Sequence, residues 1–88
     1  MEYFLFTYPN CSKCDEIKKY LGGADFKVRE CNLVFKENRL KIREFLNFLK
    51  RDDEGAIIIP TLVLQENGEV VTVLNNRTEL EDWLRSKA

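Results

Sequence analysis

The sequence predicts one α/β domain in which a four-stranded mixed sheet is flanked by three helices. Three observations lead to this fold class. An apolar run at residues 3–8 comes directly before a Cys-x-x-Cys pair and an amphipathic helical pattern. A second strand pattern follows within about 30 residues, which makes a βαβ unit with parallel strands. After a second helical pattern, Asn67-Gly68 joins two further strands ahead of a last helix. The element order is therefore βαβ-α-ββα.

The first part of the chain is expected to form a strand, a helix and a second strand. Residues 3–8 are continuously apolar or aromatic, as in a strand buried on both faces. The first helix should run from about residue 11 or 12 to residue 21. Gly22-Gly23 should end it, because glycine accepts the left-handed conformation that often terminates helices. Residues 26–31 alternate weakly and predict the second strand.

A second amphipathic helix is predicted over about residues 37–50, with Asn38 as a candidate N-cap. Four apolar residues recur at the spacing i, i+3, i+4 and i+7, which gives one apolar stripe. These residues are Ile42, Phe45, Leu46 and Leu49. A polar loop over residues 51–55 should follow.

The last part of the chain predicts a hairpin and a final helix. Pro60 has no N–H to donate to a sheet, so the third strand should begin at Thr61. The fourth strand should cover residues 69–74, after the Asn-Gly turn. Thr78 to Glu81 match a capping box that opens the final helix. Its inward residues should be Leu80, Trp83 and Leu84.

Composition narrows the classes of function. The 88-residue chain is 44% hydrophobic and has a net charge of −1, which suits one small globular domain. A charge so close to zero offers no basic surface, so we expect neither nucleic acid nor a membrane as partner. The absence of histidine excludes Ser-His and Cys-His catalytic pairs. Three cysteines, an odd number, argue against a secreted disulfide framework, so we expect a cytoplasmic protein.

Cys11 and Cys14 are the candidate catalytic residues. Residues three apart in a helical turn lie on one face, at a separation that a disulfide can bridge. The helix N-terminus presents free N–H groups and a partial positive charge, which stabilise a thiolate at Cys11. Because the thiolate is the nucleophile, this placement favours redox chemistry at Cys11.

Two other interpretations of the cysteines stay open. Cys11 and Cys14 could be structural thiols, or the protein could share an iron–sulfur or metal cluster with a second chain. A structural zinc in one chain needs four Cys or His ligands, and this chain has only three cysteines and no histidine. We therefore predict no metal site. The third cysteine, Cys31, is expected to be a buried core thiol.

The strand–Cys-x-x-Cys–helix start, together with Ile59-Pro60-Thr61, resembles a glutaredoxin of the thioredoxin-fold superfamily. The resemblance covers nearly the whole chain, since the element order also matches. It implies the sheet order 2-1-3-4, with the last hairpin antiparallel to the first two strands. It also implies that Pro60 is cis and packs beside Cys11. The backbone of Ile59 would then be free to pair with a peptide or glutathione.

The sequence departs from glutaredoxins where they bind glutathione. Tyr8 stands where the family usually carries a basic residue, and the family's Gly-Gly and acidic pair before the last helix are missing. We therefore expect weak use of glutathione. The candidate substrate-binding residues are Tyr8, Lys13, Ile59, Pro60, Asn76 and Arg77.

The resemblance implies a dithiol thiol–disulfide oxidoreductase that reduces protein or glutathione mixed disulfides. Cys11 would attack the disulfide and Cys14 would resolve the intermediate. We expect a monomer without a resident cofactor, recharged by glutathione or by a thioredoxin reductase. The alternative is a non-catalytic thioredoxin-fold binding module or a cluster-sharing protein.

Overall fold

Four strands form one mixed sheet in the order β2-β1-β3-β4, as predicted. The computed structural model describes residues 1–23 and 27–87. β1 pairs in parallel with β2, and β3 is antiparallel to both β1 and β4. The predicted second strand began at Phe26, which lies outside the described residues. The strands cover Glu2–Thr7 (β1), Val28–Asn32 (β2), Thr61–Glu66 (β3) and Glu69–Leu74 (β4).

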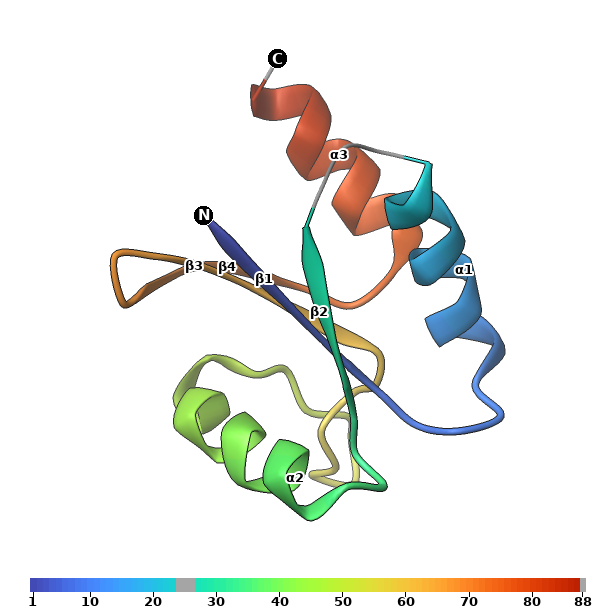
Figure 1. Ribbon diagram of the computed structural model, residues 1–88, viewed down its shortest axis with the longest axis vertical. Helices are drawn as coiled ribbons and strands as arrows, with labels where there is room; N and C mark the ends of the chain where they lie inside the picture. Colours follow the sequence, from blue (N-terminus) through green and yellow to red (C-terminus); the bar gives the residue numbers. More distant parts are fainter. Residues whose placement is uncertain (24–26, 88) are drawn as a thin grey trace.

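Helices cover both faces of this sheet. α1, Ser12–Gly22, and α3, Arg77–Lys87, lie on one face, and α2, Lys36–Ile42, lies on the other with the 3₁₀ helix η1, Arg43–Phe48 (Figure 1). The resulting three layers match the predicted α/β class. Among the described residues, no helix combines the length and the apolar character that crossing a membrane requires.

The middle of β1, residues 3–6, is apolar or aromatic because both faces of the strand are covered. Leu5 belongs to the core cluster beneath α1 and α3, whereas Phe4 and Phe6 belong to the cluster beneath α2 and η1. Alternate residues of a strand point to opposite faces of a sheet, so a central strand needs apolar side chains at every position. This burial fixes β1, and with it the chain that leads into Cys11.

The prediction of one α-helix over residues 37–50 is wrong in its second half. The α-helix ends at Ile42 and a 3₁₀ helix continues to Phe48. With three residues per turn, a residue four positions after Ile42 is rotated by about 120° from it, instead of about 40° in an α-helix. Leu46 is accordingly 37% exposed, whereas Phe45 is buried.

The first helix ends at Gly22, as predicted, but Gly23 has φ −86° and is not left-handed. The predicted N-cap of the second helix is wrong. The N-cap of α2 is Phe35, whose side chain makes no capping hydrogen bond. Asn38 instead donates from Nδ2 to the carbonyl of Asn32 at 2.8 Å, which ties the first turn of α2 to the end of β2.

The cap of α3 lies two residues earlier than the sequence predicted. Asn76, not Thr78, accepts the N–H of Glu79 at 2.8 Å through its side-chain oxygen. The Glu79 carboxylate turns back and accepts the N–H of Asn75 at 2.7 Å. The pattern resembles a capping box, except that the Glu79 carboxylate accepts the N–H of the residue before the N-cap.

The Asn67-Gly68 turn is confirmed. Asn67 and Gly68 have φ of 53° and 81°, the two successive positive values that a type I′ hairpin turn requires. Glu66 and Glu69 flank the turn as register partners.

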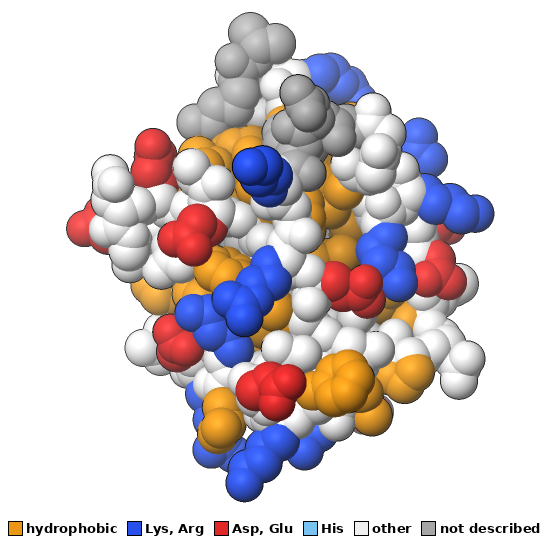
Figure 2. Space-filling model, viewed as in Figure 1, with side chains coloured by type: hydrophobic (Ala, Val, Ile, Leu, Met, Phe, Trp, Pro, Cys, Tyr) orange, Lys and Arg blue, Asp and Glu red, His pale blue; other side chains and the backbone are white. Residues whose placement is uncertain are grey.

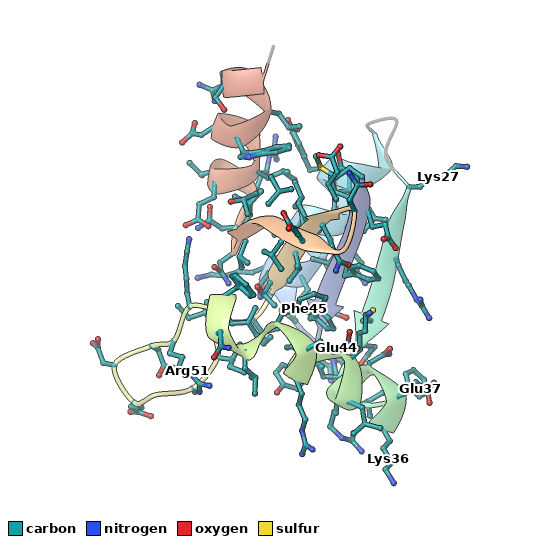
Figure 3. The ribbon with its side chains drawn as sticks, turned by 90° about the vertical axis from the view of Figure 1, so that its left-hand side faces the viewer. Lys27, Lys36, Glu37, Glu44, Phe45 and Arg51 are labelled. Carbon is teal, nitrogen blue, oxygen red and sulfur yellow. A yellow bond between two sulfur atoms is a disulfide. The ribbon has the colours of Figure 1, made fainter. Side chains whose placement is uncertain are left out.

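Phe45 should contribute much of the stability of the layer formed by α2 and η1. Its ring centroid lies 5.9 Å from that of Phe4 and 6.1 Å from that of Phe6, and Figure 3 shows it between η1 and the sheet. Phe45→Ala should lower the free energy of unfolding by about 3–5 kcal/mol, because it leaves a cavity. Phe48→Ala, the control on the same helix, should cost less than about 1 kcal/mol, since Phe48 is 54% exposed. Urea unfolding measures both, and equal costs would contradict this account.

Candidate active site

The two cysteines of the Cys-x-x-Cys pair form a disulfide at the start of α1. Asn10 precedes them with φ 56°, a left-handed conformation that asparagine tolerates better than most residues. This turn lets the chain leave β1 and enter α1 with Cys11 as the N-cap. The Cα atoms of Cys11 and Cys14 are 5.2 Å apart, within the usual range for a disulfide.

The helix N-terminus is directed at the sulfur of Cys11. The backbone N–H of Cys14 donates to Cys11 Sγ at 3.1 Å. The N–H of Asp15 donates to the carbonyl of Cys11, also at 3.1 Å, which closes the first turn. An N–H donor and the positive end of the helix dipole both favour negative charge on this sulfur. Cys11 is therefore the sulfur best suited to carry a thiolate once the disulfide is reduced.

The two sulfurs differ in access. Cys11 is partly exposed, whereas Cys14 is 1% exposed, on the buried face of α1. An incoming disulfide therefore meets Cys11 first. This asymmetry separates the attacking thiol from the resolving thiol by position alone.

A polar network fixes α1 to the sheet beside the cysteines. Lys18 bridges Asp15 and Glu30, at 3.4 Å to each carboxylate. Glu30 also accepts a hydrogen bond at 3.1 Å from the hydroxyl of Thr7, which is buried at the end of β1. The Glu30 charge raises the pKa of Lys18, which remains an ammonium ion at neutral pH. The network also offsets the charge of Asp15 near the cysteines.

The loop before β3 is held by hydrogen bonds on either side of Ile59. The Ile59–Pro60 bond is cis, as predicted. Ile58 donates its N–H to the carbonyl of Lys50 at 3.1 Å. The Asn75 side-chain amide donates to the carbonyls of Ile58 and Pro60, both at 3.1 Å. The main chain of Ile59 makes no hydrogen bond within the described part of the chain, so its N–H and C=O groups are open to a ligand.

Asn75 is the positioning residue that the sequence reasoning missed. It is only 6% exposed and lies between the end of β4 and the cap of α3. Glu79 accepts its backbone N–H and is also bound to Lys50 Nζ at 3.2 Å. Asn75 thus links the start of α3 to the loop before β3. The sequence indicates this role only through the position of a polar residue directly after Leu74, where the predicted fourth strand ends.

Two of the predicted substrate-binding residues meet at one groove. Tyr8 and Ile59 line a groove of about 270 Å³ between the loop before β3 and the layer formed by α2 and η1. Pro60 is buried, so it shapes this region without offering surface, and its contact with Cys11 stays a prediction. Lys13 is exposed in the first turn of α1 and makes no hydrogen bond or ion pair with any described residue.

Arg77 and Asn76 are engaged within the protein. Arg77 Nε lies 2.7 Å from a Glu81 carboxylate oxygen, and its guanidinium stacks over the Tyr20 ring at 5.3 Å. Tyr20 is nine residues after Cys11, about 13 Å along the helix axis. In this structure Arg77 therefore interacts near the far end of α1. Asn76 caps α3 through its side-chain oxygen.

Cys31 is a core thiol, as predicted. It is 1% exposed in the cluster beneath α2 and η1, on the opposite face of the sheet from α1. Burial raises the pKa of its thiol, so it is protonated and a poor nucleophile at neutral pH. Among the described residues, no three His, Cys, Asp or Glu side chains gather to hold a metal ion.

Comparison with known proteins adds one finding. A scan of protein-family models and a search of curated protein sequences found no match. Among solved structures, the crystal structure of the thioredoxin-like protein BC3987 aligns with 94% of this chain and 99% of its own, with a TM-score of 0.57 and 23% identity. The chain has the thioredoxin fold. Within this thioredoxin fold, the disulfide, the cis-proline loop and the groove form the candidate active site.

Asn75→Ala should loosen the cis-proline loop. Removing both side-chain hydrogen bonds should lower the free energy of unfolding by about 1–3 kcal/mol. It should also speed hydrogen exchange at the Ile58 amide, because the loop opens more often. Asn47→Ala, a control at an exposed asparagine in η1, should change neither quantity measurably. Parent-like exchange at Ile58 in Asn75→Ala would remove Asn75 from this role.

Proposed function

We propose that the protein is a glutaredoxin-like dithiol oxidoreductase that reduces disulfides of other proteins through Cys11 and Cys14. One observation carries the proposal. The two cysteines close a disulfide at a helix N-terminus, with an N–H donor on the partly exposed sulfur and the second sulfur shielded. This arrangement supplies an activated nucleophile together with a resolving thiol within bonding distance.

The proposed reaction has two exchange steps. In the reduced protein, the Cys11 thiolate attacks one sulfur of a substrate disulfide. A mixed disulfide forms and the other substrate sulfur leaves as a thiolate. Cys14 then loses its proton and attacks Cys11, which restores the intramolecular disulfide and releases the first substrate sulfur as a thiolate. Two electrons pass from the cysteine pair to the substrate, and protons from solvent or from Cys14 complete the two product thiols.

The N–H of Cys14 acts when Cys11 is the nucleophile, because it stabilises negative charge on this sulfur. When a reductant later opens the disulfide, it attacks Cys11, the partly exposed sulfur, and the buried Cys14 leaves and takes up a proton. The geometry therefore suits repeated cycles between the dithiol and the disulfide.

The features around the site support a protein substrate over glutathione. Tyr8 offers no positive charge to a glutathione carboxylate. Arg77 is bound to Glu81 and Tyr20, and the side-chain oxygen of Asn76 is used in capping α3. The open groove beside Ile59 is instead suited to an extended segment of another protein.

The roles of the two cysteines predict opposite results on substitution. Cys11→Ser should abolish disulfide reduction, because a serine hydroxyl stays protonated near neutral pH. Cys14→Ser should still attack substrate but should accumulate the mixed disulfide on Cys11, which mass spectrometry detects. Cys31→Ser is the control and should retain turnover within a few-fold of the parent, since Cys31 lies across the sheet. Continued turnover by Cys11→Ser would show that the assignment is wrong.

The choice of reductant predicts a second result. Loss of one hydrogen bond to a charged group lowers affinity by about ten- to a hundredfold, so glutathione should recharge the protein poorly. The test is an NADPH-coupled assay run with glutathione plus glutathione reductase, and separately with thioredoxin reductase. We expect faster NADPH consumption in the second assay. Efficient turnover confined to the first assay would contradict the prediction, and Arg77→Ala would then test whether Arg77 rearranges to bind glutathione.

A further inference from the structure

The groove beside Ile59 is lined by apolar and positively charged side chains, which the exchange reaction itself does not require. Apolar side chains form most of its lining, and its only charged lining residues among those described are arginines. One of its lining residues, Tyr8, lies three residues before Cys11 in the chain. The lining residues are Tyr8, Leu33, Arg39, Ile42, Arg43, Leu46, Ile57 and Ile59.

The two arginines differ in how they are held. Arg39 Nη1 donates to the carbonyls of Leu33 and Val34 at 3.0 and 2.8 Å, which fixes its guanidinium beside the groove. The Arg43 guanidinium forms no hydrogen bond or ion pair with the described residues. The nearest acid in sequence, Glu44, is bound to Lys41 at 3.3 Å. The groove therefore carries positive charge that no described acidic side chain offsets by an ion pair.

Exposed apolar side chains extend the same surface. Tyr8 is 53% exposed and Leu46 is 37% exposed at the groove itself. Phe35 and Leu40, 55% and 51% exposed, lie on the segment that carries Arg39. In the lower part of Figure 2, where Figure 1 places α2, hydrophobic side chains lie beside both basic and acidic ones, whereas the groove itself is lined by arginines and by no described acid. A partner that covers this surface needs both apolar and acidic groups.

We propose, on the basis of the oxidoreductase function above, that this groove selects protein substrates whose cysteine is followed or preceded by an apolar residue and an acidic residue. The substrate segment lies extended from Cys11 along the groove, and the free main chain of Ile59 pairs with it. Its apolar side chain packs against Leu46 and Tyr8. Its carboxylate binds Arg43, and Arg39 adds to the positive potential. Arg43 is thus a specificity-determining residue.

The experiment compares two peptides that differ at one position. Each carries a cysteine in a mixed disulfide with 2-thiopyridine, an adjacent leucine, and then either glutamate or lysine. Release of thiopyridone reports the attack by reduced Cys11. The parent protein should react with the glutamate peptide about five- to tenfold faster, measured as kcat/KM, which is the range for a partly exposed charged hydrogen bond. The variable position is also moved by one residue in either direction, so that the carboxylate is tested at three positions along the groove.

Charge reversal gives the decisive comparison. Arg43→Glu should reverse the preference and favour the lysine peptide. Arg85→Glu makes the same change in net charge on α3, at a side chain that is 73% exposed on the opposite face of the sheet. It should keep the parent's preference for glutamate. Equal rates for the two peptides in the parent at every position, or the same preference in parent and Arg43→Glu, would overturn the proposal.

Two further measurements separate this inference from the function on which it rests. Peptides with serine in place of cysteine should bind the oxidised parent with the same charge preference, measured by fluorescence anisotropy without any redox step. If this preference appears and the parent reduces no disulfide, including a small uncharged one, the docking groove stands and the oxidoreductase function is wrong. Oxidised glutathione also carries carboxylates. If Arg43→Glu impairs its reduction as strongly as that of the glutamate peptide, the groove binds glutathione, and the assignment to acidic protein segments is wrong.

Discussion

The hydrogen bond from the Cys14 N–H to Cys11 Sγ is the interaction on which the chemistry of this fold depends. It exists only if α1 begins at the residue after Cys11, and that requires the chain to leave β1 through a sharp turn. Burial of β1 on both faces fixes where this turn begins. The ion pair between Lys18 and Glu30 then links α1 to β2. Sheet, turn and helix thus place one sulfur at a helix N-terminus.

A second set of contacts holds the loop before β3, for which we propose a role in substrate binding. Asn75 joins the start of α3 to the carbonyls that flank Ile59, and Glu79 extends the link to Lys50 at the end of the α2–η1 layer. Segments far apart in sequence therefore share one small network. Most of its hydrogen bonds involve main-chain groups, so the loop is fixed in position while its outward surface stays free to vary.

The sequence predicted the individual strands and the disulfide well because each follows from local patterns, whereas the order of the strands came from the resemblance to glutaredoxins. The apolar run of β1, the Asn67-Gly68 turn and the spacing of Cys11 and Cys14 each determine a local structure. Helix ends were predicted less well, since Asn76 and Thr78 are both acceptable N-caps and tertiary contacts decided between them. The change from α2 to η1 and the role of Asn75 depend on packing between distant segments. No local pattern contains that information.

The position of Cys31 has a consequence for the three cysteines taken together. A third thiol close to a pair of redox cysteines can form a disulfide with either of them, because thiolates exchange with any disulfide that they reach. Here the sheet stands between Cys31 and the helix that carries Cys11 and Cys14. The native fold therefore admits one intramolecular pairing of the three possible ones. The central sheet thus separates Cys31 from the two cysteines to which we assign the redox cycle.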